Sequence, residues 1–255
     1  MTYPSSLDIS RGIASGHRLV RQFGRNTAVG GTFVPVSRSG VYRTPQVAAA
    51  PLLRIRSGGN AADSANGTGA RSVTLIGLDV NGDYITETIA TAGASASALT
   101  VNRFLRLADA RVATSGTYST QTALSHVASI NIEDAAGNLW ATIQDTDIPR
   151  GDTEIGSYSV PRNRTLFITN VKLQAEPSNK SNIVMFERSG ILQSAPPYDA
   201  MILIQEFPSF SGNLQFTFDP PIRINELTDV GFLAKTATST TDVAVAFDCI
   251  EVYPS

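Results

Sequence analysis

Apolar and polar residues alternate over short stretches along most of this chain, as they do in β-strands that bury one face. The clearest case is a pair of runs at residues 72–78 and 84–89, separated by the sequence DVNGD at residues 79–83. Asn-Gly between two strand-like runs is typical of a β-hairpin, because both residues tolerate a positive φ. The pattern therefore predicts an all-β fold that contains this hairpin.

Further alternating runs predict the other strands. In the first half of the chain they lie at residues 52–56, 103–107, 129–133 and 139–144, and the turn 134–138 joins the last two. In the second half they lie at residues 157–160, 165–173, 182–187, 201–207, 214–218, 222–224, 230–234 and 243–253. Short strands with turns at intervals of roughly ten residues are typical of a β-sandwich or jelly roll. Pro220 and Pro221 fall between two of these runs, so we expect them to separate two strands or to mark an edge.

Changes in composition divide the chain into three parts. Residues 1–50 are rich in Gly, Ser, Pro and Thr and show no sustained periodicity, so we predict an extended N-terminal arm with one or two short strands. Residues 145–156 are polar and include Pro149, which predicts a boundary. We therefore expect a β-rich domain at residues 51–148 and a β-sandwich, jelly-roll-like domain at residues 153–255.

The overall composition is that of a folded chain rather than a disordered one. It has 255 residues, 42 % of them apolar and only 16 % charged, and a formal net charge of −2. A surface of Ser and Thr hydroxyls suits strands and turns better than exposed helices. No run of about 18 apolar residues is present, so we expect no transmembrane helix. The first residues lack a basic start and an apolar stretch, so we expect no secretory signal.

Positive charge is concentrated in the N-terminal part. Residues 1–56 hold eight arginines against one acid, Asp8, which gives +7, and the remainder carries −9 because the total is −2. Arginines with scattered apolar residues fit three roles: binding to nucleic-acid phosphates, a solvated tail, or an arm that docks on a neighbour. Nucleic-acid arms have denser clusters and more Lys, and a solvated tail leaves the apolar residues without a purpose. We therefore favour a docking arm and expect no nucleic-acid partner.

The predicted arm has a suitable partner in other copies of this chain. A basic arm suits an acidic body, because guanidinium groups bind carboxylates with two hydrogen bonds while apolar side chains fill grooves. We therefore expect a homo-oligomer. The predicted docking residues are Arg11, Arg18, Arg21, Phe23, Arg25, Phe33, Val36, Arg38 and Arg43.

Two short motifs are similar to binding sites but have a simpler interpretation as turns. Asp79, Asn81 and Asp83 carry oxygens at alternate positions, as at the start of a calcium loop. In that loop glycine stands at the sixth position, whereas Gly82 is the fourth residue here and strands flank it, so we predict a hairpin turn. The tripeptide Arg150-Gly151-Asp152 matches an integrin-type recognition motif, but three residues match often by chance, and we predict a turn or linker.

Candidate catalytic groups have no supporting sequence context. Ser125 and His126 lack a G-x-S-x-G sequence around the serine. The loop 57–69 is rich in glycine but lacks the G-K-[ST] sequence of a phosphate-binding loop. Paired acids at turns and strand ends are expected to be solvated rather than to act as a glycosidase pair; they are Glu133 with Asp134 and Asp145 with Asp147.

Cysteine and histidine are too scarce for most metal or nucleophilic chemistry. The single cysteine, Cys249, excludes an internal disulfide and a multi-cysteine zinc cluster. It lies in an alternating run, so we predict a small buried apolar residue. His17 and His126 are the two histidines, and they lie in dissimilar segments. We therefore predict no catalytic residues, no cofactor and no metal site in a protein that is not an enzyme.

Several segments together carry a resemblance to a known family. They are HRLVRQFGRN at residues 17–26, VGGTFVP at 29–35, GTGARSVTLIGLD at 67–79 and FDPPIR at 218–223, with a final strand through residues 247–248. This order of motifs resembles that of virion structural proteins from tailed double-stranded DNA bacteriophages and covers most of the chain. The resemblance implies a component of the head, neck or tail, located in the virion and assembled in the cytoplasm of the bacterial host. It implies no catalytic residue.

The leading hypothesis is a non-enzymatic structural component of a tailed bacteriophage particle. It would be a head decoration or cement protein, or a neck or tail ring component, that binds copies of itself and other virion proteins without a membrane. A second hypothesis is a receptor- or carbohydrate-binding tail module. Exposed aromatic residues would support it, and Tyr198 and Phe232 are the ones present in the loops 190–199 and 230–239. A third is a depolymerase, but the long parallel repeats of tailspike enzymes are absent from the sequence.

Overall fold

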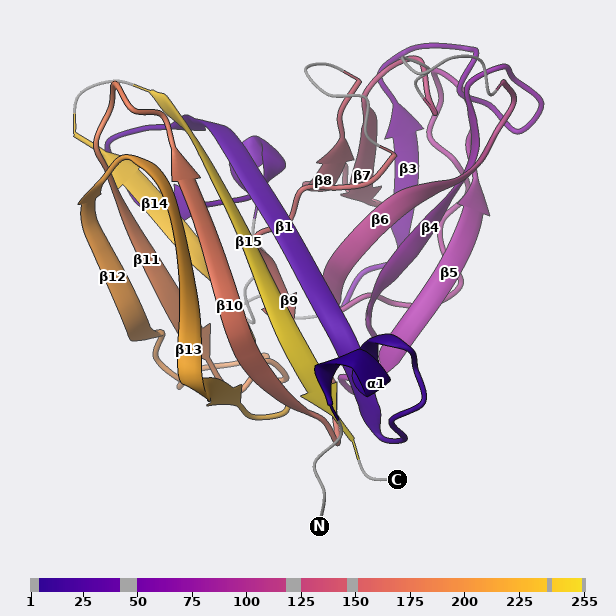
Figure 1. The fold of residues 1–255 in the computed structure, drawn as a ribbon. Helices are drawn as coiled ribbons and strands as arrows, with labels where there is room; N and C mark the ends of the chain where they lie inside the picture. Colours follow the sequence, from indigo (N-terminus) through magenta and orange to yellow (C-terminus); the bar gives the residue numbers. More distant parts are fainter. Residues whose placement is uncertain (1–4, 42–49, 118–124, 146–150, 238–239, 254–255) are drawn as a thin grey trace. The chain divides into compact units, whose positions relative to one another are not determined.

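The computed structural model describes residues 5–41, 50–117, 125–145, 151–237 and 240–253 (Figure 1). In this part of the chain nearly all regular structure is β-strand, which confirms the all-β prediction. The helices are short: α1 (Ser6–Ser10) has five residues and the 3-10 helix η1 (Arg38–Gly40) has three. Among the described residues, no helix is long and apolar enough to cross a membrane.

The chain forms two compact units, and each has its own sheets. The terminal unit comprises Met1–Val36, Gly156–Ile191 and Pro197–Ser255, and the central unit comprises Ser37–Ile155 and Leu192–Pro196. The terminal unit therefore combines N-terminal residues with the C-terminal part of the chain.

The terminal unit is a sandwich of two antiparallel sheets. The first sheet has the strand order β1 (His17–Val29), β15 (Thr241–Val252), β10 (Thr165–Ala175) and β13 (Gly212–Ile224). The second has the order β12 (Ile202–Phe210), β11 (Ser181–Arg188), β14 (Asp229–Thr236) and β2 (Val34–Pro35), and β9 (Ser157–Ser159) also pairs with β14. The rings of Phe232 in β14 and Phe247 in β15 lie 5.6 Å apart, so the two sheets pack against each other.

Strand β15 shows how the sequence pattern sets the buried face. Its odd-numbered residues are buried and its even-numbered residues are partly exposed over the whole length. Val245, Phe247 and Cys249 belong to the core, so the prediction that Cys249 is a small buried residue is confirmed. Burial raises the pKa of the Cys249 thiol, with further contributions from the charges of Asp248 and Glu251. The thiol therefore stays neutral.

The central unit contains two three-stranded sheets. One has the order β3 (Leu53–Ser57), β7 (Ile130–Asp134) and β8 (Leu139–Ile143), and the other has the order β5 (Tyr84–Ala90), β4 (Ala70–Leu78) and β6 (Arg106–Ser115). Both sheets contribute to one apolar core, whose members include Leu53, Leu75, Phe104, Ile130, Ile132 and Trp140. The hairpins β4–β5 and β7–β8 occur where the sequence predicted them.

The prediction of a strand at residues 103–107 gives the wrong position. β6 instead spans Arg106–Ser115, and Phe104 reaches the core from the segment before it. Alternation alone does not separate a buried loop residue from a strand residue, because both are apolar.

The two strands expected on either side of Pro220 and Pro221 are one strand, β13. The register of β13 against β10 slips between Ile168 and Asn170, so the two prolines lie at an irregularity of the ladder. β13 is also the last strand of its sheet. Proline is tolerated at such a position, because no ladder hydrogen bond is required from it.

The extended N-terminal arm is not confirmed, because its strands pair with strands of the terminal unit. β1 runs antiparallel to β15, from His17 opposite Val252 to Asn26 opposite Val243, and Figure 1 shows the two strands side by side. β2 pairs with β14, and Val36 directly after it is fully buried. These residues are an edge of the terminal sandwich rather than a separate arm.

Candidate functional site

Two arginines on the outer face of β1 bind carboxylates of β15. Arg21 donates from Nε to Asp248 Oδ1 at 2.6 Å, and Arg25 donates from Nε and Nη2 to Asp242 Oδ2 at 2.9 and 2.5 Å. The hydrogen bond to Asp248 and its charge raise the pKa of Arg21 further above its usual value. Both carboxylates lie on the outer face because alternate residues of a strand share a face.

A third arginine of β1 contacts Glu251 of β15, which is fully buried. Oε2 of Glu251 accepts hydrogen bonds from Tyr158 at 2.7 Å and Arg18 at 3.3 Å, and Oε1 accepts one from Arg164 at 2.7 Å. A buried carboxylate is costly unless it is both paired and hydrogen-bonded, and Glu251 meets both conditions. The network connects distant segments of the terminal unit, which is a structural role.

The sequence prediction for Arg18, Arg21 and Arg25 therefore needs correction. We expected these arginines to bind carboxylates of a neighbouring copy, but they bind carboxylates of their own chain. The reason is the antiparallel pairing of β1 with the acidic strand β15, which brings opposite charges together within the sheet.

The remaining predicted docking residues have separate environments. Val36 is fully buried and does not face a partner, whereas Phe33 has 42 % of its surface exposed. Arg11 is exposed at the end of α1, and Arg38 lies in η1 of the central unit. Arg43 lies outside the described residues. Docking of Arg11, Phe33 and Arg38 on a neighbour stays a prediction.

The ninth predicted docking residue, Phe23, lines a trough on the outer face of the first sheet. Phe23 of β1 lies opposite Ala246 of β15, which lies opposite Lys172 of β10. One row further along, Ala244 lies opposite Gln174. Because both β15 residues are alanines, this strand forms the floor of a cavity of about 450 Å³.

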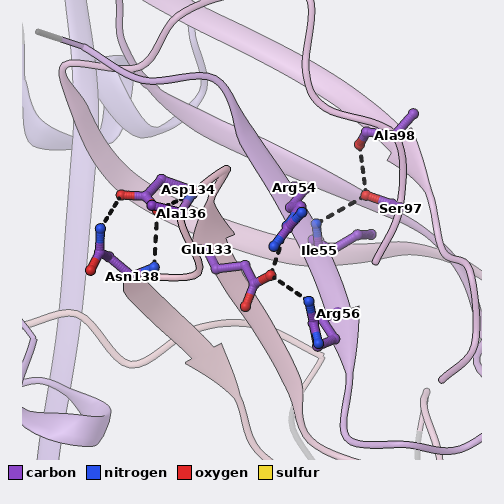
Figure 2. Close-up of polar contacts among 9 residues, drawn as sticks. All are labelled: Arg54, Ile55, Arg56, Ser97, Ala98, Glu133, Asp134, Ala136 and Asn138. Atoms are coloured by element: carbon purple, nitrogen blue, oxygen red, sulfur yellow. Dashed lines mark hydrogen bonds and ion pairs between the residues drawn. The ribbon is translucent and has the colours of Figure 1, made fainter. Parts of the chain in front are cut away.

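In the central unit, Figure 2 shows polar contacts on both sides of β3. Oε1 of Glu133 in β7 accepts a hydrogen bond from Arg54 Nε at 2.7 Å and lies 3.3 Å from Arg56 Nη2. Toward the other edge of β3, Ser97 Oγ accepts a hydrogen bond from the backbone N–H of Ile55 at 3.0 Å. Glu133 is only 7 % exposed, so the expectation of a solvated acid is wrong for this residue.

The turns after β4 and β7 share one hydrogen-bond pattern. Oδ1 of Asp79 accepts from the backbone N–H groups two and four residues later, at 2.8 and 2.9 Å. Oδ1 of Asp134 does the same at 3.0 and 2.9 Å (Figure 2). In both turns the residue three positions after the aspartate is a glycine with a positive φ, 82° at Gly82 and 86° at Gly137. The hairpin prediction for residues 79–83 is thereby confirmed.

Asp63 is a fully buried carboxylate that the sequence analysis missed. Its Oδ1 accepts from the backbone N–H groups of Ala70 and Val127, both at 2.9 Å, and its Oδ2 accepts from that of Ala128 at 2.9 Å. The carboxylate therefore fixes the glycine-rich loop 57–69 against a distant segment. The available signal was a single acid in a loop of small residues.

Ser125 and His126 lie within hydrogen-bond distance of each other. Ser125 Oγ is 3.0 Å from Nδ1 of His126, and Nε2 is 2.8 Å from the carbonyl oxygen of Gln144. A carbonyl only accepts, so Nε2 carries the hydrogen and Nδ1 accepts from the serine hydroxyl. The ring is 1 % exposed and is oriented by a backbone carbonyl rather than by the acid of a triad. Among the described residues, no group of three His, Cys, Asp or Glu side chains is placed to hold a metal ion.

No protein-family model matches this chain, and no curated protein sequence matches it. Among solved structures, one of infectious bursal disease virus strain Gt is similar over 94 % of this chain and 73 % of that chain, with 8 % identity and a TM-score of 0.26. A structure of strain Gx is similar over 94 % of this chain and 72 % of that chain, with 9 % identity and a TM-score of 0.27. A structure of an isomalto-dextranase of Arthrobacter globiformis T6 is similar over 93 % of this chain and 35 % of that chain, with 11 % identity and a TM-score of 0.21. TM-scores of this size do not establish a common fold or a shared role.

Proposed function

We propose that this chain is a non-enzymatic structural protein of a virus particle that associates with neighbouring copies of itself. The sequence resemblance points to a tailed bacteriophage, and the finer role of head decoration or of neck or tail ring rests on that resemblance alone. The observation that carries the proposal is the presence of exposed apolar side chains on two consecutive edge strands of the terminal unit, β12 and β13. A surface of this kind is typical of an interface.

Large apolar side chains lie exposed on both of these edge strands. In β12, Ile202 is 57 % and Leu203 is 54 % exposed, and in β13 Phe216 is 43 % exposed. In the part of the chain that the structure describes, β12 ends one sheet and β13 ends the other, so each has an outer edge without a paired strand. Exposed apolar edge strands recruit further strands. Glu206 is the one charged residue of β12, so charge gives this edge little protection.

A second copy of the chain is the partner that the edge strand β12 fits best. Two identical edge strands can pair antiparallel about a twofold axis, and such a contact is closed. Pro208 in β12 lacks an N–H donor, which limits pairing to the part of the strand before it. A short, symmetric contact is what a repeated particle subunit requires.

Polar groups that would support catalysis are instead used to hold the fold together. Glu133 binds arginines of β3, Asp63 binds backbone N–H groups, and His126 binds a backbone carbonyl. These contacts support a role in the virion without enzymatic activity, with other virion proteins as further partners.

The test is sedimentation velocity of the full-length chain, with Leu203→Glu as the variant and Val101→Glu as the matched control. Val101 is apolar and 88 % exposed but belongs to the central unit, whereas β12 belongs to the terminal unit. We expect the unmodified chain and V101E to self-associate with equal affinity. L203E should associate at least about tenfold more weakly, because it places an unpaired charge in the contact. Equal association of all three proteins, or a monomeric unmodified chain, would contradict this interface.

A further inference from the structure

Outward-facing side chains of the first sheet lie in rows across its four strands. The register places Phe23, Ala246, Lys172 and Gln215 in one row. The next row holds Arg25, Ala244, Gln174 and Asn213. In each row the small side chain belongs to β15. The two alanines therefore leave a trough between β1 and β10 that is two strand spacings, or about 9.6 Å, wide.

Two ion pairs lie on the same outer face, beyond the two alanines along β15. Asp242 and Asp248 are the next outward residues of β15, and they bind Arg25 and Arg21 respectively. The cavity of about 450 Å³ falls within the range of small-molecule sites, about 300–1,000 Å³. A cavity of this volume suits a ligand of a few rings.

The walls of the trough combine an aromatic ring with primary amides. Phe23 lines one side, and Gln174, Asn213 and Gln215 line the other together with the ammonium group of Lys172. A primary amide donates and accepts hydrogen bonds at once, as a hydroxyl group requires of its partners. The aromatic ring and the methyl groups of the floor pack against apolar C–H groups.

We propose that this trough binds a neutral carbohydrate. The C–H face of a pyranose ring packs against Phe23 and the alanine floor, and its hydroxyl groups bind the amides. Nucleic acid fits less well, because Arg21 and Arg25 are balanced by carboxylates and Lys172 is the one cation among the described residues that line the trough. The inference goes beyond the proposed structural role, since it gives the terminal unit a ligand that is not protein.

The test is an NMR titration of the isotopically labelled full-length chain with maltotetraose, cellotetraose and tetra-N-acetylchitotetraose as probes. We expect at least one probe to shift the backbone amide signals of Ala244, Ala246 and Gln174, with a dissociation constant in the millimolar range because the site is open. Ala246→Leu fills the floor and should weaken this binding at least about tenfold. Ala90→Leu is the matched control, since Ala90 is an exposed alanine in β5 of the central unit.

Three results would overturn the proposal. One is the absence of saturable binding for all three probes, and another is equal binding by the unmodified chain and A246L, with circular dichroism confirming that both are folded. The third is an A246L variant that binds the probes normally but self-associates more weakly, because the trough is then a protein interface. L203E examines the edge strand β12 and A246L examines the trough, so the failure of one proposal leaves the other standing.

Discussion

Two buried carboxylates, one in each unit, are stabilised in different ways. Glu251 of the terminal unit and Asp63 of the central unit are both fully buried. Glu251 accepts hydrogen bonds from the side chains of Arg18, Arg164 and Tyr158, whereas Asp63 accepts them from backbone N–H groups. The comparison separates two uses of buried charge, one that joins distant strands and one that shapes a loop.

Both carboxylates bind donors that are distant in the sequence, but the donors differ in kind. Arg18 and Glu251 are 233 residues apart, and long side chains bridge strands whose backbones are already paired. Asp63 is seven residues from Ala70 but 64 and 65 residues from its other donors, Val127 and Ala128, and all three donate from the backbone. Backbone donors have fixed positions once the loop has folded, so the carboxylate and the loop conformation depend on each other.

The chain contains one natural probe for each unit. Its single tryptophan, Trp140, is buried in the central unit, and its single cysteine, Cys249, is buried in the terminal unit. Trp140 fluorescence during urea unfolding therefore reports on the central unit, and thiol labelling of Cys249 reports opening of the terminal unit. The same carboxylate-to-amide change at Glu251 and Asp63 can thus be compared within one protein.

Glu251→Gln is expected to have the largest effect. The amide keeps the shape of the side chain but removes the charge that balances Arg18 and Arg164. Breaking a buried ion pair costs about 3–5 kcal/mol, and because both arginines are partly exposed we expect about 3 kcal/mol. Pulsed labelling of Cys249 across a urea series measures this loss of stability in the terminal unit.

Glu206→Gln is the matched control for this change, since Glu206 of β12 is exposed. Its effect should stay within about 0.5 kcal/mol. In E251Q the Trp140 transition should not move, because Glu251 belongs to the terminal unit. A shifted Trp140 transition with unchanged Cys249 labelling would contradict the role given to Glu251.

Asp63→Asn is expected to have the next largest effect, this time on the Trp140 transition. The amide of Asn has an oxygen that accepts hydrogen bonds and an NH2 group that only donates them. It therefore cannot replace both carboxylate oxygens as acceptors for the backbone N–H groups of Ala70, Val127 and Ala128. Loss of hydrogen bonds to a charged group costs about 1.5–3 kcal/mol, and we expect about 2 kcal/mol. A Trp140 transition that is the same in D63N and the unmodified chain would show that the loop holds its conformation without the carboxylate.

Elements with a local signal are the ones that the sequence predicts well. Asp79 and Asp134 each precede a glycine by three residues, and both glycines have the positive φ that the turn requires. The long alternation of β15 likewise predicts its buried face. In these cases the residues that decide the structure are neighbours in the sequence.

The sequence predicts only short strands in the segment of β1, because the inward positions of β1 carry mostly polar or small residues. Gln22 and Asn26 are buried, and each donates a side-chain hydrogen bond to a backbone carbonyl group. Gly24 lies between them where a Cβ atom would come within 2.2 Å of the backbone of Gly156. The strand therefore satisfies its buried face without the apolar alternation that marks a strand in the sequence.

The site residues depend on pairings that the sequence does not display. Glu251 occupies one of the buried positions of the alternating strand β15, which indicates a buried acid that requires a partner. No neighbouring residue in the sequence identifies Arg18 or Arg164 as that partner. The trough needs the register of four strands before Phe23 and Gln215 fall into one row. Register on this scale is set by tertiary pairing.

The smallest effect is expected for the exposed pair of Arg21 and Asp248. The Arg21 side chain is 71 % exposed, so water competes for both groups, and such pairs contribute about 0–1 kcal/mol. Arg21→Ala should lower the stability reported by Cys249 by less than about 0.5 kcal/mol at physiological salt. This difference should disappear in 1 M salt, where the screening length is about 3 Å, whereas most of the E251Q effect should remain because the network around Glu251 is buried. If R21A costs as much as E251Q, surface pairs hold β1 in place, and the distinction between buried and exposed charge is wrong for this sheet.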